Sequence, residues 1–498
     1  MRKNNQSLSL VLLLVGLLTV STFGLPSAFA DKPNVVVFLA DDQGWGDLSL
    51  NGNTNLNTPA IDSLARDGAS FDNFYVCPVC SPTRAEFLTG LYHARLNVTS
   101  TSAGGERMDL GVPTIADILK AQGYRTAAFG KWHSGMQYPY HPCGRGFDLF
   151  YGFCSGHWGN YFSPLLERNG ELVQGRGFCV DDFTNQAIEF MHDCVAKDEP
   201  FFAYLPYNTP HSPMQVPTEF WSEFKNKDLK MRNRDPQRED VEHTRAALAM
   251  VENIDMNVGN VLGKLDEWGV ASNTIVLYFT DNGPNGFRWN GGMKGRKGAT
   301  DEGGVRSPLL VRWPSKIAPG KKIETIAGAI DLLPTLAELT GARLSSAKLQ
   351  TQELDGTSLA PLLTQDLTNV TWPQRAIVNS WRKKVSVRNQ RFRLDNGGKL
   401  FDIDSDRGQK TDVTARFPEV HKELTAIASA FRTDVLSKQS AVDQRPFTLG
   451  SEKFRHTQIP ARDAVFTGGI IRSNKFPNCS FSPTGKMKNK RSLGLSKC

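Results

Sequence analysis

Short apolar runs alternate with helical patterns along most of this chain. Four runs are apolar almost throughout, as strands covered on both faces are, at residues 34–40, 125–129, 201–205 and 274–280. Between the last two, apolar residues recur at helical spacing over residues 248–265, and Gly269 follows as a stop signal. This alternation predicts an α/β fold in which helices sandwich a large, mostly parallel central sheet.

The residues that follow these four runs are polar and capable of chemistry. The ends carry, in chain order, Asp41 and Asp42, then Lys131 and His133, then His211, then Asp281 and Asn282. Asp and Asn are common in turns, so one such strand end would mean little. In open α/β sheets, however, ligands bind beyond the carboxyl ends of the strands. Four polar ends together therefore predict a single site at one edge of the sheet.

Beyond about residue 365 the alternation weakens. Residues 381–389 and 392–403 predict short antiparallel strands, and residues 418–431 predict a helix that packs on them. We therefore expect a large domain over residues 31–365 and a small C-terminal α+β subdomain over residues 366–435. Residues 436–498 form a basic tail with little periodicity, which receives no role.

The first thirty residues differ from the rest. Arg2 and Lys3 precede an apolar stretch over residues 8–20, and Ala28-Phe29-Ala30 has the small-x-small pattern of a cleavage site. This predicts a signal peptide over residues 1–30 and export, to the periplasm or out of the cell. The apolar stretch is shorter than the ~20 residues that a membrane span needs, so we expect no stable membrane insertion.

Composition narrows the class of protein. With 40% hydrophobic residues in a chain of 498, a large core can form and a disordered chain is excluded. The 58 basic and 51 acidic residues give a net charge of only +7. This mild excess does not indicate a nucleic-acid partner, although it suits an anionic substrate. The eight cysteines are too few for a disulfide scaffold, but an oxidising compartment would permit bridges such as Cys143 with Cys154 or Cys179 with Cys194.

Residues 80–90 carry the strongest motif, Cys-Ser-Pro-Thr-Arg-Ala-Glu-Phe-Leu-Thr-Gly. Here the chain resembles the type I sulfatases, the formylglycine-dependent, arylsulfatase A-like group of the alkaline phosphatase superfamily, whose signature is C-x-P-x-R followed by an apolar pair and Thr-Gly. Matching blocks follow in the family's order at residues 40–42, 130–133, 280–283 and 297–304. The resemblance covers roughly residues 33–430. It implies the alkaline-phosphatase-like fold and makes the large domain the catalytic one.

The resemblance implies that a separate formylglycine-generating enzyme oxidises Cys80 to Cα-formylglycine. A hydrated aldehyde carries two hydroxyls on one carbon, so one oxygen can attack sulfur while the other later expels sulfate. Pro82 suits the first turn of a helix, whose free N–H groups favour an anion. The nucleophile is therefore expected at an anion-binding helix start.

The resemblance also implies a metal site formed by Asp41, Asp42, Asp281, Asn282 and the oxygen of the modified Cys80. These are hard oxygen donors that suit Ca²⁺, with Mg²⁺ as the alternative. Without a cation, three clustered carboxylates would repel an incoming sulfate, and a divalent ion reverses that field.

The cationic half of the expected site is formed by Arg84, Lys131 and Lys297. Arg84 lies four residues after Cys80 and therefore on the same helical face, where it can pair with the hydrate or the carboxylates. Lys131 and Lys297 are expected to hold sulfate oxygens. Lys294 lies close by, but Lys297 fits the family block better because it directly precedes Gly-Ala-Thr-Asp-Glu-Gly-Gly.

Two histidines complete the catalytic set. His133 is expected to deprotonate the hydrate, and His211 to protonate the leaving alcohol or steady the sulfate, since imidazole titrates near ~6.5. A lone histidine is usually structural. The remaining ones considered, His141, His157, His192 and His243, receive no role.

Together these residues predict an exported sulfatase that hydrolyses sulfate monoesters, on a sulfated glycan or polysaccharide. One alternative is a phosphate or phosphonate ester hydrolase of the same superfamily. Another is an exported sulfoglycan-binding protein on an inactive scaffold, against which the intact set of expected residues argues. The expected partners are a sulfated carbohydrate and, during maturation, the formylglycine-generating enzyme.

Overall fold

The computed structural model describes residues 32–344, 353–440, 443–452, 454–459, 472–476 and 479–481. The predicted signal peptide lies outside the described residues, as does most of the basic tail. Within the described part of the chain, no helix combines the length and the apolar character needed to cross a membrane.

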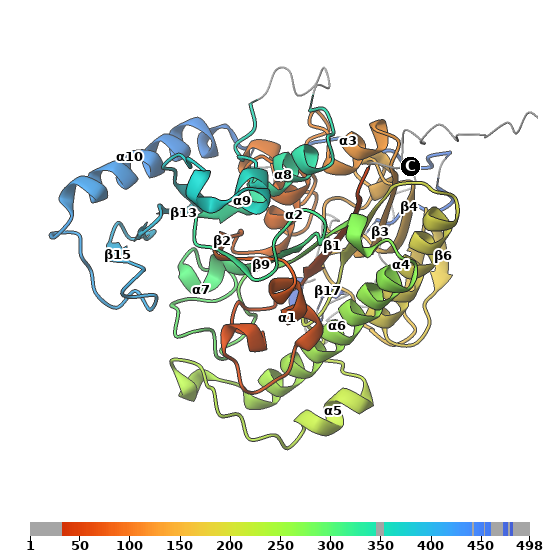
Figure 1. Ribbon diagram of the computed structural model, residues 1–498, viewed down its shortest axis with the longest axis horizontal. Coiled ribbons are helices and arrows are strands. Elements are labelled where there is room, and N and C mark those ends of the chain that lie inside the picture. The colour runs from red at the N-terminus through yellow and green to blue at the C-terminus, as the bar shows by residue number, and fades with distance from the viewer. Residues whose placement is uncertain are drawn as a thin grey trace, which may run out of the picture.

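A mixed sheet of eleven strands forms the centre of the molecule (Figure 1). Its strands are β1 (Asn34–Ala40), β2 (Ala69–Tyr75), β3 (Arg125–Lys131), β4 (Leu149–Phe153), β5 (Leu165–Arg168), β6 (Glu171–Gln174), β7 (Phe201–Pro206), β8 (Thr274–Thr280), β9 (Arg306–Arg312), β10 (Lys321–Ile323) and β11 (Ala327–Gly328). The order is β10-β2-β9-β8-β1-β7-β3-β4-β5-β6, with β11 paired to β2. The middle of the sheet, from β8 to β4, is parallel, which confirms the expected fold class.

Helices cover both faces of this sheet because successive strand residues point to opposite sides. In β1, Val35 and Val37 enter one core with helices α2 (Cys80–Thr89), α3 (Ile115–Ala121) and α8 (Leu332–Leu339). Val36 and Phe38 enter the other core with α1 (Pro59–Arg66), α4 (Cys179–Ala196) and α6 (Val241–Glu267). Figure 1 shows the two groups of helices on either side of the sheet.

The four predicted strands are the parallel strands β1, β3, β7 and β8. Strand β3 runs two residues further than expected, because Gly130 and Lys131 still pair with β4. The predicted helix is α6, and Gly269 follows it with φ of 72°, a left-handed conformation that suits glycine.

Several strands were not expected from the sequence. Strand β9 inserts antiparallel between β2 and β8, and β5 and β6 form a hairpin at one edge. The Asn169-Gly170 turn of this hairpin has φ of 49° and 88°. An Asn-Gly pair between alternating residues is a hairpin signal, so this element was recoverable from the sequence.

A separate antiparallel sheet forms the C-terminal subdomain. It contains β12 (Ile377–Trp381), β13 (Lys384–Arg388), β14 (Phe392–Leu394) and β15 (Leu400–Asp402), with α10 (Pro418–Asp434) packed against it. The first expected strand is β13, and β12, which a tight turn at Arg382 joins to it, was not expected. The second expected strand is divided into β14 and β15 by a loop at Gly398. The remaining elements include α5 (Thr218–Phe224), α7 (Glu302–Val305), α9 (Ala360–Thr364), β16 (Arg472–Phe476) and β17 (Cys479–Phe481).

Part of the tail packs on the large domain. Arg445 forms an ion pair with Asp109 at 2.8 Å, and the ring of Phe454 lies 4.6 Å from that of His141. These residues, which received no role from the sequence, therefore contact the large domain.

The suggested disulfides are also wrong. Cys154, Cys179 and Cys194 are free thiols, so neither suggested bridge forms. Cys179 and Cys194 lie near opposite ends of the same helix, α4, which separates them by about 22 Å. That is far beyond the reach of a disulfide.

Candidate active site

The register of the parallel strands brings the polar ends together. Ala40 of β1 is paired with Thr280 of β8, so Asp41 and Asp281 leave the sheet at the same level. The Asp281 N–H donates to the carbonyl of Ala40 at 3.1 Å. Asp42 follows with φ of 66°, a conformation that is costly for a non-glycine residue and is commonest at functional sites.

The three aspartates and the asparagine at these strand ends form a fully buried group. Asp41, Asp42, Asp281 and Asn282 have no exposed surface. The Asp42 N–H donates to Oδ1 of Asp281 at 3.1 Å, and Nδ2 of Asn282 donates to Oδ1 of Asp42 at 2.9 Å. Burial and the neighbouring Asp41 raise the pKa of Asp281.

Three oxygens in this group have no hydrogen-bond donor among the described residues. They are Oδ1 of Asp41, Oδ2 of Asp42 and Oδ1 of Asn282. Buried oxygens are nearly always paired in folded proteins, so three of them together need an explanation. Carboxylate and amide oxygens are the donors that Ca²⁺ and Mg²⁺ take, and the residues present therefore fit a divalent cation.

Helix α2 begins at Cys80 and carries it to this group. Its residues are all buried, and it ends where Gly90 adopts φ of 71°. The sulfur of Cys80 and one carboxylate oxygen from each of Asp41 and Asp281 lie within 4.8 Å of one another. Burial raises the pKa of the Cys80 thiol, so the unmodified side chain is a neutral and weak nucleophile.

One turn later, Arg84 binds the same carboxylates. Its NH2 group lies 2.9 Å from Oδ2 of Asp281, and its NH1 group donates to the carbonyl of Lys131 at 2.7 Å. The hydroxyl of Thr83 donates to the carbonyl of Asp281 at 2.6 Å. Side chains near the start of α2 therefore bind the residue that follows β8.

Two lysines supply the remaining positive charges that face the three carboxylates. Nζ of Lys131 donates to Oδ2 of Asp41, and Nζ of Lys297 lies 2.5 Å from Oδ1 of Asp42. Although burial alone would raise the pKa of Asp41, Lys131 and the other cations hold it well below its ordinary value. Lys294 instead pairs with Asp301 at 3.0 Å. The geometry thus brings Lys297, and not Lys294, to the expected position.

His133 has the features of a base. Its Nε2 lies 2.9 Å from the carbonyl of Thr101, which can only accept, so Nε2 carries the proton. Nδ1 is buried and has no partner among the described residues. Burial and Lys131 hold the pKa of His133 well below its ordinary value, which leaves the ring neutral.

His211 approaches from the end of β7. Its Nε2 lies 3.6 Å from Oδ2 of Asp42, and its Nδ1 lies 2.7 Å from the carbonyl of Ser212. The exposed ring of His157 meets it edge-on, with ring centres 4.7 Å apart. All the predicted site residues except His133 are therefore joined by direct contacts, and His133 lies close enough to Lys131 and Asp41 for their charges to act on it.

Comparison with known proteins identifies the family of the chain. Residues 33–342, more than half of the chain, match the Sulfatase family model. The chain belongs to the sulfatase family. It is thereby a sulfuric ester hydrolase, and the family expected from the Cys80 motif is confirmed.

Individual sulfatases resemble the chain over most of its length. It is 31% identical to mouse N-acetylgalactosamine-6-sulfatase over 382 residues, covering 70% of this chain and 69% of the relative. It is 34% identical to human arylsulfatase A over 374 residues, covering 68% of each. The crystal structure of Ps i-CgsB in complex with k-i-k-neocarrahexaose superposes with a TM-score of 0.71 at 30% identity, covering 83% of this chain and 95% of that one.

Sequence reasoning missed two features of this sulfatase site. Thr83 occupies a variable position of the motif, so no signal marked its bond to Asp281. His157 received no role, although it is exposed and lies against His211. Only the fold brings the loop after β4 to the end of β7.

Proposed function

We propose that this sulfatase is exported and hydrolyses sulfate monoesters of a glycan or polysaccharide at Cys80. The observation that carries the proposal is the meeting of Cys80 with three carboxylates and three cations at the carboxyl end of the sheet. A carbohydrate substrate is favoured by the relatives, since one is named for a sulfated amino sugar and another was crystallised with k-i-k-neocarrahexaose.

Residue 80 is proposed to act as formylglycine, made by a separate generating enzyme. One hydroxyl of its hydrate would bond to sulfur as the bond between sulfur and the alcohol oxygen breaks. The second hydroxyl would then lose its proton and become the aldehyde oxygen as the C–O bond to sulfate breaks, and water would restore the hydrate. Asp41, Asp42, Asp281 and Asn282 would hold Ca²⁺ or Mg²⁺, whose charge polarises the S–O bonds. The buried oxygens without donors are the observation that supports this ligand set.

The remaining residues bind the sulfate and move protons. Lys131 and Lys297 offer ammonium groups to the sulfate oxygens, where negative charge develops. Arg84 holds Asp281 and the start of α2 in place. Nδ1 of His133 would accept a proton from the attacking hydroxyl. Nε2 of His211 would donate one to the leaving alcohol from the protonated ring, because Nδ1 already donates its proton to the carbonyl of Ser212.

The proposal is tested by measuring sulfate release from sulfated glycans and simple aryl sulfates, with phosphate and phosphonate esters of the same alcohols in parallel. Preferential turnover of the sulfate esters is expected. Turnover of phosphorus esters alone would support the alternative hydrolase. Binding of sulfated glycan without turnover, with unmodified Cys80 by mass spectrometry, would support the inactive binding protein.

Export is tested separately by expressing the full chain and a chain that lacks residues 1–30. We expect only the full chain outside the cytoplasm. Equal distribution of the two would contradict the predicted signal peptide.

A further inference from the structure

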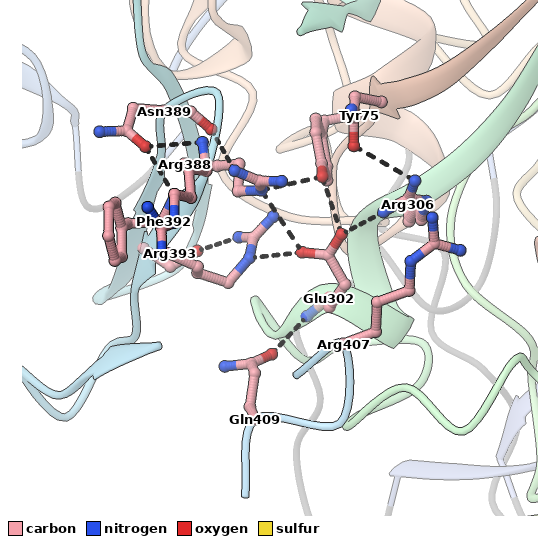
Figure 2. A network of polar contacts seen from close by, with 12 residues as sticks. Tyr75, Glu302, Arg306, Arg388, Asn389, Phe392, Arg393, Arg407 and Gln409 are labelled. Carbon is pink, nitrogen blue, oxygen red and sulfur yellow. Dashed lines mark hydrogen bonds and ion pairs between the residues drawn. The ribbon is translucent and has the colours of Figure 1, made fainter. Parts of the chain in front are cut away.

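A second buried charge cluster lies where the large domain meets the C-terminal subdomain (Figure 2). We call it the Glu302 cluster, and it consists of Tyr75, Glu302, Arg306, Arg388 and Arg393. One carboxylate oxygen of Glu302 accepts from the Tyr75 hydroxyl at 2.7 Å and from Arg306 at 2.8 Å. The other accepts from Nε of Arg393 at 2.9 Å. Nε of Arg388 donates to the Tyr75 hydroxyl at 3.0 Å. The central sheet and the C-terminal sheet therefore both bind the Glu302 carboxylate.

The C-terminal subdomain also holds the backbone just before Glu302. NH1 of Arg393 donates to the carbonyl of Thr300 at 3.1 Å, and the hydroxyl of Ser386 donates to the same oxygen at 2.6 Å. The Glu302 N–H donates to Oε1 of Gln409 at 2.8 Å. Backbone groups at both ends of residues 300–302 are therefore fixed by residues 86 to 107 positions away in the chain.

This fixed segment is continuous with the loop that carries Lys297. Lys297 precedes Thr300 by three residues, and between them the Gly298 N–H donates to the carbonyl of Pro78 at 2.8 Å. On the same side, Nδ2 of Asn379 donates to the carbonyl of Val76 at 2.9 Å. The C-terminal sheet thus contacts both the Lys297 loop and the segment that leads to Cys80.

We propose that Arg393 is a positioning residue for Lys297. It binds Thr300 and Glu302 together and so fixes the loop from which Lys297 reaches Asp42. A lysine side chain has four rotatable bonds, so its ammonium group is placed only as well as its backbone is held. A displacement of about 1 Å at a reacting centre can cost about 10²-fold in rate. The inference rests on the proposed function and extends it to the role of the C-terminal subdomain.

The test is a double-mutant cycle with Arg393→Gln, Lys297→Ala and the combined variant, each assayed well below its own unfolding temperature. We expect Arg393→Gln to lower kcat/KM for a sulfate ester about 10- to 100-fold, and the combined variant to be no slower than Lys297→Ala alone. Losses that multiply in the combined variant would show that Arg393 does not act through Lys297, and would overturn the inference.

Two further variants keep the test decisive. Arg391→Gln is the matched control, because Arg391 pairs with Asp402 at 2.7 Å, is half exposed and does not contact the loop. It should retain full activity. If Arg393→Gln fails to fold, Ser386→Ala enters the same cycle. It removes the hydroxyl bond to Thr300 and the bond that this hydroxyl accepts from NH1 of Arg393 at 3.0 Å, and leaves the Arg393 side chain in place. A Ser386→Ala loss that multiplies with Lys297→Ala counts against the inference equally.

A binding measurement separates this inference from the proposed function. The same cycle is measured for the affinity of inorganic sulfate by calorimetry, which needs no turnover. Non-additive loss of sulfate affinity supports positioning even if the wild type releases no sulfate, an outcome that would contradict only the proposed function. Wild-type turnover with additive losses in both measurements would contradict only the inference.

Discussion

The two buried charge clusters of this sulfatase differ in the kind of polar atom that is left without a hydrogen-bond partner. At the active site, three carboxylates face Arg84, Lys131 and Lys297, and the polar atoms left without partners include three acceptor oxygens. In the Glu302 cluster, one carboxylate faces three guanidinium groups. The atoms left there are donors, namely Nε of Arg306, NH2 of Arg388 and NH2 of Arg393.

This difference shows why buried charge alone does not mark a catalytic site. The Arg388 and Arg393 side chains have no exposed surface, whereas Lys297 keeps 19% of its side chain exposed. Solvent therefore reaches Lys297 of the active site but neither Arg388 nor Arg393 of the Glu302 cluster. Acceptors without donors, with one partly exposed cation beside them, are suited to ligand binding, while shared carboxylate oxygens hold two domains together.

The largest expected difference between the clusters is the effect of Cys80→Ala. Loss of the nucleophile should reduce sulfate release by at least about 10⁴-fold, roughly 5 kcal/mol in activation free energy. The unfolding temperature should change little, because only one small side chain is shortened. The measurement is sulfate release with calorimetry of the same samples. Cys143→Ser, at a partly exposed thiol away from the site, is the control and should stay active.

Next in size is the effect of Lys297→Ala. Removing one cation that faces the developing charge should cost about 10²- to 10³-fold in kcat, or about 3–4 kcal/mol. Lys294→Ala should change kcat less than about threefold, since Lys294 forms partly exposed ion pairs with Asp301 and Asp395. Steady-state kinetics with one sulfate ester compares the two. Equal losses of kcat in the two variants would contradict the assignment of Lys297, and not Lys294, to the active site.

Glu302→Gln should act on stability. Burial alone would raise the pKa of Glu302, but Arg393, Arg388 and Arg306 lower it from 4.5 to about 2. Because the folded pKa lies below the unfolded value, this stabilisation is present above about pH 4.5 and is lost as pH falls toward 2. The shift corresponds to about 3 kcal/mol.

Urea unfolding at several pH values measures this effect. Glu302→Gln should unfold more easily than the wild type at pH 7, and the gap should narrow as the pH falls below 4.5. Glu199→Gln removes an exposed ion pair with Arg125 and should change stability by less than about 0.5 kcal/mol. A constant gap across the pH range would contradict the role assigned to the Glu302 carboxylate.

The smallest expected effect is stabilisation by the cation. At a Ca²⁺ concentration about 100 times its Kd, binding should add about 2.7 kcal/mol to the free energy of unfolding. Asp281→Asn should lose this increment. Glu302→Gln should keep it, although its free energy of unfolding without Ca²⁺ is lower than that of the wild type. Thermal unfolding with Ca²⁺ and with a chelator measures both. A Ca²⁺ increment that survives Asp281→Asn would place the ion elsewhere.

Much of this molecule was predictable because the relevant signals are local. Strands β1, β3, β7 and β8 are apolar runs whose burial on both faces leaves a direct pattern in the sequence. The Cys80 motif likewise lies within one helix, α2, and the glycine that ends it. Parallel pairing then suffices to predict that Asp41 and Asp281 meet at one edge of the sheet.

The tertiary structure alone decided which atoms are left over and what holds the site in place. The choice of Lys297 over Lys294 rests on contacts with Asp42 and Asp301. The Glu302 cluster joins Tyr75 to Arg388, residues more than 300 positions apart, and no local pattern encodes that contact. Apolar periodicity fixes which residues are buried, but the partners of a buried charge depend on the order in which distant strands and subdomains pack.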